Sequence, residues 1–279
     1  MLLRRLAVQI QKSHMSLRSA PAELSEVLSR WQGGTVHLKR DGPIGRLILD
    51  RPEKNNCLSG QMMLELRQRV EEIVNREDLA VVVVEGVGKS FCSGADLGMI
   101  NELSTPSLGS AMFLYMSETL SALRGSPPLI VANIHGHCLG GATEIATACD
   151  IRIARKDSKM GFMQAMMGIV PSWGGASWLE ETVGRSTALK LMVTAPLMSA
   201  QEAKSIRWLD EVVEGREEAE KFISSLAKFS PAVVQAQKRM LSGVLSGKDK
   251  ELEVIQSVWG GPDQKRAVEK QLDAVVKKK

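Results

Sequence analysis

The sequence predicts an α/β fold that is followed by a helical C-terminal part. Strand, helix and strand patterns alternate over roughly residues 79–154, an order typical of βαβ units with right-handed crossovers. The run LAVVVVEG contains four consecutive β-branched residues, which predict a strand in a sheet covered on both faces. After residue 174 the patterns are mostly helical and no strand is expected, so we expect these helices to pack outside the sheet or on another subunit.

The N-terminal third combines one helix, a hairpin and a second helix. An amphipathic helix is predicted at 22–31, followed by the strands TVHLK and GRLILD, which the turn DGPIG joins as a hairpin. The segment RPEKNNCL is a predicted loop. Ser59 is a predicted N-cap of a helix near 60–76, because Met62, Leu66 and Val70 fall on one face.

The remaining elements follow from periodicity and from Gly or Pro boundaries. Beyond the strand at 79–86 we expect a helix at about 107–124, a strand in PPLIVANIHG, a helix in GGATEIATAC and a strand in DIRIAR. The later helices are expected at about 175–183, 186–193, 199–206, 215–228, 231–245 and 263–276. This pattern divides the chain into a leader at 1–21, an α/β core at 22–195 and a helical C-terminal region at 196–279.

Composition excludes several classes of protein. The chain is 44% hydrophobic and 24% charged, which is ordinary for a globular protein, and its net charge of +4 is too small to indicate a nucleic-acid partner. The four cysteines show no C-x-x-C spacing and no accompanying His cluster, so neither a metal site nor a disulfide framework is expected. No apolar run approaches the roughly 20 residues that span a bilayer, so no membrane partner is expected.

The N-terminus is unusually basic. The segment MLLRRLAVQIQKSHMSLRSA carries Arg4, Arg5, Lys12 and Arg18, and no acidic residue precedes Glu23. An Arg-rich, Ser-containing and acid-free start is typical of a mitochondrial transit peptide. A disordered or loosely helical basic tail fits the same residues, and the sequence leaves both readings open.

Two glycine turns follow predicted buried strands and favour an oxyanion site. FCSGAD at 91–96 and HGHCLGGATE at 135–144 both place Gly where backbone N–H groups are exposed, and the second turn opens a helix. The first N–H groups of a helix have no internal partner and lie at the positive end of its dipole. Glu144 in that first helical turn is a candidate catalytic acid, but it is equally well explained as a helix-capping residue.

These turns belong to a set of segments that resembles the crotonase (enoyl-CoA hydratase/isomerase) superfamily over about residues 35–245. The resemblance lies in RPEKNNCLSGQMM, FCSGADL, GHCLGGATEIATACDIRIA and FMQAMMGIVPSWGG. It implies a crotonase-like spiral of ββα turns with a helical C-terminal trimerisation region. It also implies an acyl-CoA substrate and a homotrimer or a hexamer made of two trimers.

The resemblance also implies which residues form the site. The backbone N–H groups of Ala95 and Gly141 match the family's two oxyanion donors, which bind a thioester enolate, and the loops 54–58 and 93–98 match its coenzyme A pocket. The residues expected to bind substrate are Lys54, Asn56, Leu58, Ser93, Asp96, Leu97, Gly140 and Trp173. No metal and no separate cofactor is expected, because coenzyme A is part of the substrate.

The catalytic carboxylates decide the expected reaction. Hydratases of this superfamily use two glutamates to add water, and the first of these matches Glu144. The second matches Gln164, four residues before Gly168. An amide cannot act as an acid or a base near neutral pH, so addition of water that needs two carboxylates is not expected.

Two Trp-Gly-Gly elements, IVPSWGG with Trp173 and VWGGP near the C-terminus, resemble a branch of the superfamily that decarboxylates ethylmalonyl-CoA and, less well, methylmalonyl-CoA. In this reading Glu144 donates a proton to the α-carbon and Gln164 holds the departing carboxylate by its amide. The apolar surround is expected from Met163, Met166, Met167 and Trp173.

The sequence also allows other interpretations of the tryptophans, the function and the location of the protein. Both tryptophans are also explained as packing residues. An enoyl-CoA hydratase or isomerase using Glu144 alone and an inactive acyl-CoA-binding protein are the alternative functions. The resemblance implies a cytosolic enzyme that clears by-products of fatty-acid metabolism, whereas the basic leader favours the mitochondrial matrix.

Overall fold

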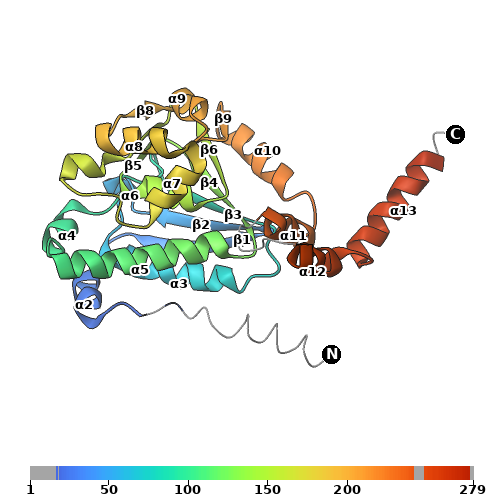
Figure 1. Ribbon diagram of the computed structural model, residues 1–279, viewed down its shortest axis with the longest axis horizontal. Coiled ribbons are helices and arrows are strands. Elements are labelled where there is room, and N and C mark those ends of the chain that lie inside the picture. Colours follow the sequence, from blue (N-terminus) through green and yellow to red (C-terminus); the bar gives the residue numbers. More distant parts are fainter. Residues whose placement is uncertain (1–16, 18, 242–247, 277–279) are drawn as a thin grey trace.

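The computed structural model describes residues 17, 19–241 and 248–276, and its centre is a six-stranded sheet (Figure 1). The strand order is β1-β2-β3-β4-β6-β9, with β1 antiparallel to β2 and every other pair parallel. The strands are β1 Thr35–Asp41, β2 Ile44–Asp50, β3 Val81–Gly86, β4 Leu129–Ile134, β6 Ile151–Arg155 and β9 Glu211–Val213. The predicted α/β class and the predicted hairpin are therefore confirmed.

The valine run of β3 explains how the sheet is covered. Val82 and Val84 belong to the large core cluster, whereas Val81 and Val83 belong to a second, smaller cluster. Because successive side chains of a strand point to opposite faces, one run of valines serves both layers. The large core is built with α3 (Gly60–Val74) and α5 (Pro106–Gly125), and the small one with α10 (Arg216–Leu226).

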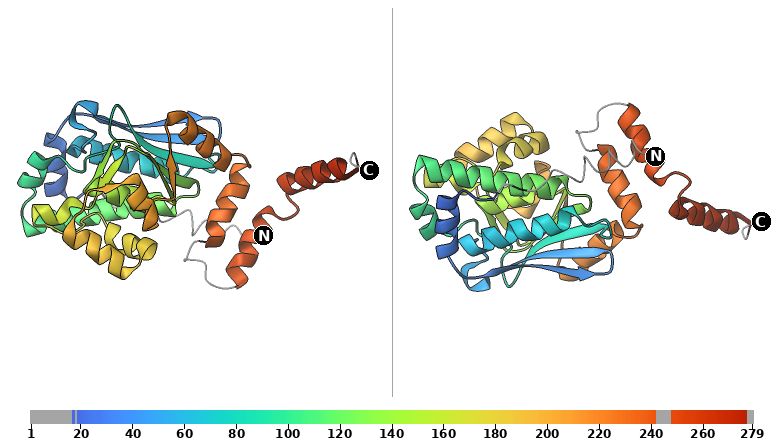
Figure 2. Two further views of the ribbon diagram at one scale, coloured as in Figure 1. Left: turned by 90° about the horizontal axis from the view of Figure 1, so that it is seen from above. Right: turned by 90° about the horizontal axis from the view of Figure 1, so that it is seen from below.

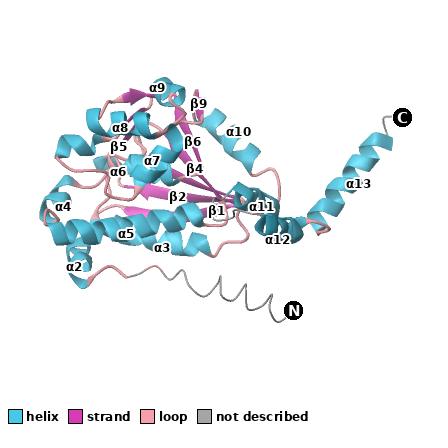
Figure 3. Cartoon of the chain, viewed as in Figure 1, coloured by secondary structure: helices cyan, strands magenta, loops and turns pink. Residues whose placement is uncertain are grey.

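A second, three-stranded sheet lies beside the main one and carries the second glycine turn (Figures 1 and 3). Its order is β5-β7-β8. The strands are β5 His137–Leu139, β7 Lys159–Gly161 and β8 Met198–Ser199, and the helices α6 Gly141–Ala148, α7 Gly175–Val183, α8 Arg185–Thr194 and α9 Ala200–Ser205 lie between or after them. The helix α6 begins directly after β5, so the second glycine turn is the link between them.

The expectation of a strand-free region after residue 174 is wrong. The strand β8 pairs with β7, and β9 pairs in parallel with β6 as an edge strand of the main sheet, so the sheet includes residues beyond the expected core boundary at 195. Strands of two and three residues are too short to show an alternating pattern, and only their partners define them. The helix α4 (Leu97–Glu102), the helix α12 (Lys248–Val258) and the 3-10 turns Pro52–Lys54 and Met163–Met167 were also not predicted.

The other predicted helices are present, with shifts of a few residues. The helix α2 spans Ala22–Arg30, and Ser59 caps α3 by accepting a hydrogen bond from the Met62 N–H group. The helix α11 spans Pro231–Leu241, and its expected continuation to 245 lies outside the described residues, as does most of the basic leader at 1–21. Among the described residues, no helix is long and apolar enough to cross a bilayer.

The C-terminal helices leave the body of the molecule. The helix α12 packs on α11, and α13 (Pro262–Val276) extends away from the two sheets (Figures 1 and 2). The second Trp-Gly-Gly element forms the turn between α12 and α13, and its Trp259 side chain is 74% exposed. Other exposed apolar side chains of these two helices are Leu252, Ile255, Val268 and Leu272.

Candidate active site

The two glycine turns lie side by side, as the sequence predicts for an oxyanion site. The Phe91 N–H group donates to the His135 carbonyl at 2.7 Å, and the Cys92 N–H group donates to the His137 carbonyl at 3.0 Å. A Cβ atom on Gly94 would lie 3.4 Å from the Gly141 nitrogen. The first turn therefore ends against the start of α6, and a glycine at 94 permits this approach.

The N–H groups of Ala95 and Gly141 are available for a ligand. Gly141 is the first residue of α6, so its N–H group has no acceptor within the helix. Ala95 lies opposite Leu58, but the hydrogen bonds there are made by the neighbouring residues Gly94 and Asp96. Within the described part of the chain neither N–H group has an acceptor, and both residues are partly exposed. Two such donors can stabilise an oxyanion.

The carboxylate of Glu144 is buried and receives four hydrogen bonds. Its side chain lies in α6 with only 1% of the residue exposed. One oxygen accepts from Gln164 Nε2 at 3.0 Å and from the Ser172 N–H group at 3.1 Å. The other accepts from the N–H groups of Trp173 at 2.8 Å and Gly175 at 2.9 Å. All four donors come from a segment about 20 to 31 residues further along the chain.

The expected role of Glu144 as a proton donor requires a protonated carboxyl group, and two opposing effects act on that protonation. Burial raises the pKa of Glu144 above its ordinary value, and the four hydrogen bonds oppose that rise. A carboxylate offers about four lone-pair sites, and here each of them faces an N–H donor. A proton on Glu144 must therefore displace one of these donors.

Gln164 is turned with its amide nitrogen toward Glu144. This orientation pairs an N–H donor with the ionised carboxylate, whereas the reverse orientation would place two acceptor oxygens against each other. Its Oε1 atom is buried and has no hydrogen-bond partner, and the whole residue is 5% exposed. The contact with Glu144 uses one of the two N–H groups on Nε2, and the second can donate to another acceptor, so the role of Gln164 as a clamp for the departing carboxylate stays a prediction.

The Trp173 ring packs against Gly141. The residue is 2% exposed, and a Cβ atom on Gly141 would lie 2.5 Å from its ring. The four side chains expected to form the apolar surround differ in exposure, and Met163 is partly exposed. Trp173 is buried, whereas Met166 and Met167 are 74% and 53% exposed. The packing interpretation of Trp173 is therefore the better one.

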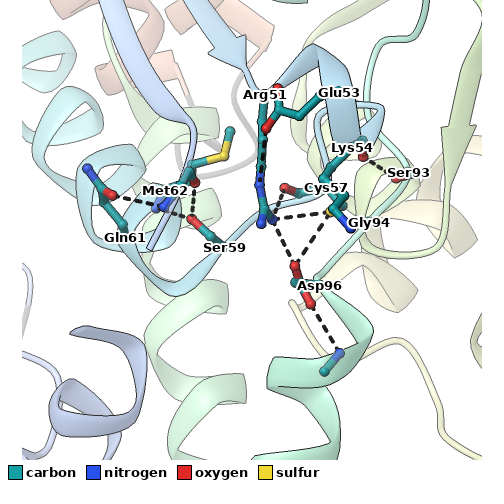
Figure 4. A network of polar contacts seen from close by, with 12 residues as sticks. Arg51, Glu53, Lys54, Cys57, Ser59, Gln61, Met62, Ser93, Gly94 and Asp96 are labelled. Atoms are coloured by element: carbon teal, nitrogen blue, oxygen red, sulfur yellow. Dashed lines mark hydrogen bonds and ion pairs between the residues drawn. The ribbon is translucent and has the colours of Figure 1, made fainter. Parts of the chain in front are cut away.

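A buried arginine that the sequence did not single out joins the two loops of the expected coenzyme A pocket. The Arg51 guanidinium forms an ion pair with Asp96 at 2.9 Å and donates to the Cys57 carbonyl at 3.3 Å (Figure 4). Asp96 also accepts from the Gly98 N–H group at the start of α4. The Asp96 carboxylate is therefore paired with Arg51 and with the Gly98 N–H group. No sequence signal indicates that Arg51 joins these loops, because nothing distinguishes it from any other arginine that follows a strand.

The expected substrate residues divide by exposure. Lys54 and Leu97 are exposed, the latter to 63%, and Ser93 and Gly140 are partly exposed. The side chains of Asn56 and Leu58 are fully buried and are not placed to touch a substrate. The sequence cannot distinguish a loop amide that binds a ligand from one that binds the backbone.

Replacing Asn56 with alanine is expected to destabilise the protein by about 3 kcal/mol, because several buried partners lose their hydrogen bonds. The Asn56 Oδ1 atom accepts from the Arg51 N–H group at 2.8 Å, and its amide donates to the carbonyls of Val87 and Ser90 at 2.8 and 2.7 Å. Urea unfolding measures the change. The neighbouring exposed Asn55→Ala is the control, and equal midpoints for the two variants would contradict the assignment.

The fold and the site together define a class of protein. A family model described as enoyl-CoA hydratase/isomerase matches residues 39–279, and the chain belongs to this family. The solved enoyl-CoA hydratase of Thermoplasma volcanium has a TM-score of 0.78 and 30% identity, covering 86% of this chain and 98% of that chain. The expected crotonase fold is thereby confirmed.

Relatives within the family carry a narrower description. The chain is 34% identical over 260 residues to a Mus musculus protein described as ethylmalonyl-CoA decarboxylase, covering 89% of this chain and 81% of that protein. It is 35% identical over 263 residues to the Homo sapiens protein of the same description, covering 89% and 85%. These similarities support the resemblance to a decarboxylating branch.

Proposed function

We propose that this chain decarboxylates ethylmalonyl-CoA and, less well, methylmalonyl-CoA. The observation that carries the proposal is Gln164, an amide hydrogen-bonded to Glu144 where a hydratase of this family needs a second carboxylate. The relatives described as ethylmalonyl-CoA decarboxylase support the same reaction. The proposed role is to clear carboxylated by-products of fatty-acid metabolism.

The chemistry requires a site that stabilises an enolate. The bond between the α-carbon and the substrate carboxylate breaks, carbon dioxide leaves, and the electron pair moves into the thioester carbonyl. The N–H groups of Ala95 and Gly141 stabilise the resulting oxyanion, and one such donor typically contributes about 3–4 kcal/mol to lowering the barrier. Coenzyme A enters as part of the substrate, and these steps call for no separate cofactor.

Protonation of the α-carbon completes the reaction. Because each oxygen of Glu144 already accepts two hydrogen bonds, we assign this proton to a water molecule, which leaves hydroxide to combine with the released carbon dioxide as bicarbonate. The net reaction consumes one water and yields butyryl-CoA and bicarbonate from ethylmalonyl-CoA.

The direct test uses ethylmalonyl-CoA carrying ¹³C in its free carboxylate. Purified full-length protein is expected to release the label as carbon dioxide and bicarbonate, and to form butyryl-CoA in equal amount, as followed by NMR and chromatography. Crotonyl-CoA hydration or double-bond migration without label release would instead support the hydratase or isomerase alternative. Tight binding of butyryl-CoA without turnover of either thioester would support an inactive binding protein.

We expect a homotrimer, or a hexamer of two trimers, held by the C-terminal helices. The exposed apolar side chains of α12 and α13 support this proposal, because helices that leave the body of a molecule need a partner for such faces. Light scattering of the full chain tests it.

We expect the enzyme to act in the cytosol. Microscopy of the full chain, compared with a chain lacking residues 1–20, tests this against the mitochondrial alternative.

A further inference from the structure

The turn before α7 encloses the side-chain carboxyl group of Glu144. Three backbone N–H groups, from Ser172, Trp173 and Gly175, converge on the Glu144 carboxylate. Gly175 is the first residue of the nine-residue helix α7, and Ser172 and Trp173 lie just before its N-cap Gly174, where unpaired N–H groups and the helix dipole favour an anion. The anion-binding position at this helix is therefore already filled by Glu144.

The sequence of the turn is fitted to this carboxylate. A Cβ atom on Gly175 would lie 2.7 Å from the Glu144 Cγ atom, so a larger residue would push the side chain away. Gly174 has a φ of +87°, a left-handed conformation that glycine adopts without strain. The Gly-Gly pair of PSWGG thus allows the backbone to close around Glu144.

The same turn positions the Trp173 ring against the oxyanion site. The Trp173 N–H group donates to Glu144, and its ring lies where a Cβ atom on Gly141 would be 2.5 Å away. Gly141 carries one of the two proposed oxyanion donors. A contiguous path of direct contacts therefore runs from the Glu144 carboxylate through Trp173 to Gly141.

We propose that Glu144 is a positioning residue, a carboxylate anchor that holds the turn 172–175 so that the Trp173 ring fixes the Gly141 N–H group, and that it does not exchange a proton with the substrate. The catalytic consequence rests on the proposed decarboxylation, whereas the anchoring itself does not. The Gln164 amide is part of the same anchor, because it supplies the fourth donor.

The first test measures the anchor without turnover. Glu144→Gln exchanges one acceptor oxygen for an amide group that faces two N–H donors, and we expect the melting temperature to fall by about 5–10 °C. Glu180→Gln makes the same substitution at an exposed position of α7 and is expected to shift it by less than about 1 °C.

A spectroscopic signature follows the ring itself. The protein contains five tryptophans and can be labelled with 5-fluorotryptophan, and Trp173→Phe identifies the ¹⁹F resonance of Trp173. We expect Glu144→Gln to shift that resonance more than the other four, and Glu180→Gln to leave all five in place. An unshifted Trp173 resonance together with an unchanged melting temperature would overturn the proposal.

The catalytic link is tested by a double-mutant cycle with Trp173→Phe on ethylmalonyl-CoA. In the wild-type background, Glu144→Gln is expected to lower kcat about tenfold and to change KM by less than about twofold. In the Trp173→Phe background, the same substitution is expected to lower kcat by less than about twofold. A proton donor would instead cost the same large factor in both backgrounds without loss of thermal stability, and that result would overturn the proposal.

The outcomes separate the two proposals. If the wild-type protein leaves ethylmalonyl-CoA unchanged, the proposed function fails, and melting temperature and the ¹⁹F spectrum still decide the anchor. If Glu144→Gln gives no folded protein while Glu180→Gln does, Glu144→Asp replaces it, because its shorter side chain keeps the charge but withdraws from the N–H groups. A Trp173 resonance and melting temperature unchanged in Glu144→Asp would then overturn the anchor.

Discussion

Replacing Gly141 with alanine is expected to lower kcat for ethylmalonyl-CoA by about 10²–10³-fold, the loss typical of one oxyanion donor. The new Cβ atom would lie 2.5 Å from the Trp173 ring, and the ring cannot yield easily because it is 2% exposed. The start of α6 must shift instead, and the Gly141 N–H group moves with it. Because the coenzyme A contacts are made elsewhere, KM is expected to change by less than about threefold.

Steady-state kinetics on purified Gly141→Ala measures this loss. Gly109→Ala is the matched control, because a Cβ atom on Gly109, in the solvent-facing part of α5, meets nothing within 4 Å. It is expected to keep wild-type kcat. A folded Gly141→Ala enzyme with kcat within about twofold of wild type would contradict the assignment of its N–H group to the oxyanion.

Gln164→Glu is expected to place a second carboxylate against the first and to destabilise the protein increasingly as pH rises. The Gln164 Nε2 atom is 3.0 Å from a Glu144 oxygen, and two carboxylates at this distance cannot both ionise without a large cost. The pair retains a proton in the folded state at a pH where unfolded glutamates, with an ordinary pKa of about 4.3, have lost theirs. The folded state of the variant is therefore favoured at low pH and loses stability as pH increases above that value.

Melting temperatures of the variant and of wild type from pH 5 to pH 9 measure this effect, and their difference is expected to widen with pH. Gln201→Glu in α9 is an exposed control that adds the same charge away from other carboxylates of the site. At a pH high enough for the pair to lose its shared proton, decarboxylation by Gln164→Glu is expected to fall by about tenfold or more, because the added negative charge then repels the substrate carboxylate. A pH-independent difference in melting temperature would show that residues 144 and 164 do not share a proton.

The sequence predicts best those elements whose signals are local. The Ser59 cap, the helix at Gly175–Val183 and the two-faced valine run of β3 each depend on residues within one element, and the structure confirms all three. The edge strand β9 is different, because its three residues become a strand only through pairing with β6. Such pairing across the chain leaves no periodic signal.

The same distinction applies to the site. The glycine turns at 94 and 140–141 could be identified because a strand followed by glycine exposes N–H groups, and the structure brings these turns together. The surroundings of Glu144 could not, because its donors lie 20 to 31 residues away and include three backbone groups with no side-chain signature. Asn56 was predicted to bind substrate because of its position in a loop, but its side-chain amide donates to backbone carbonyl groups instead.

The most direct test of the proposed decarboxylase is a competition between substrates in one reaction. Wild-type protein is given equal concentrations of ethylmalonyl-CoA, methylmalonyl-CoA and crotonyl-CoA, and the products are quantified over time by chromatography and mass spectrometry. We expect butyryl-CoA to form fastest, propionyl-CoA more slowly, and 3-hydroxybutyryl-CoA not above the rate without enzyme. Rapid 3-hydroxybutyryl-CoA formation with ethylmalonyl-CoA untouched would contradict a decarboxylase and identify a hydratase that needs only one glutamate.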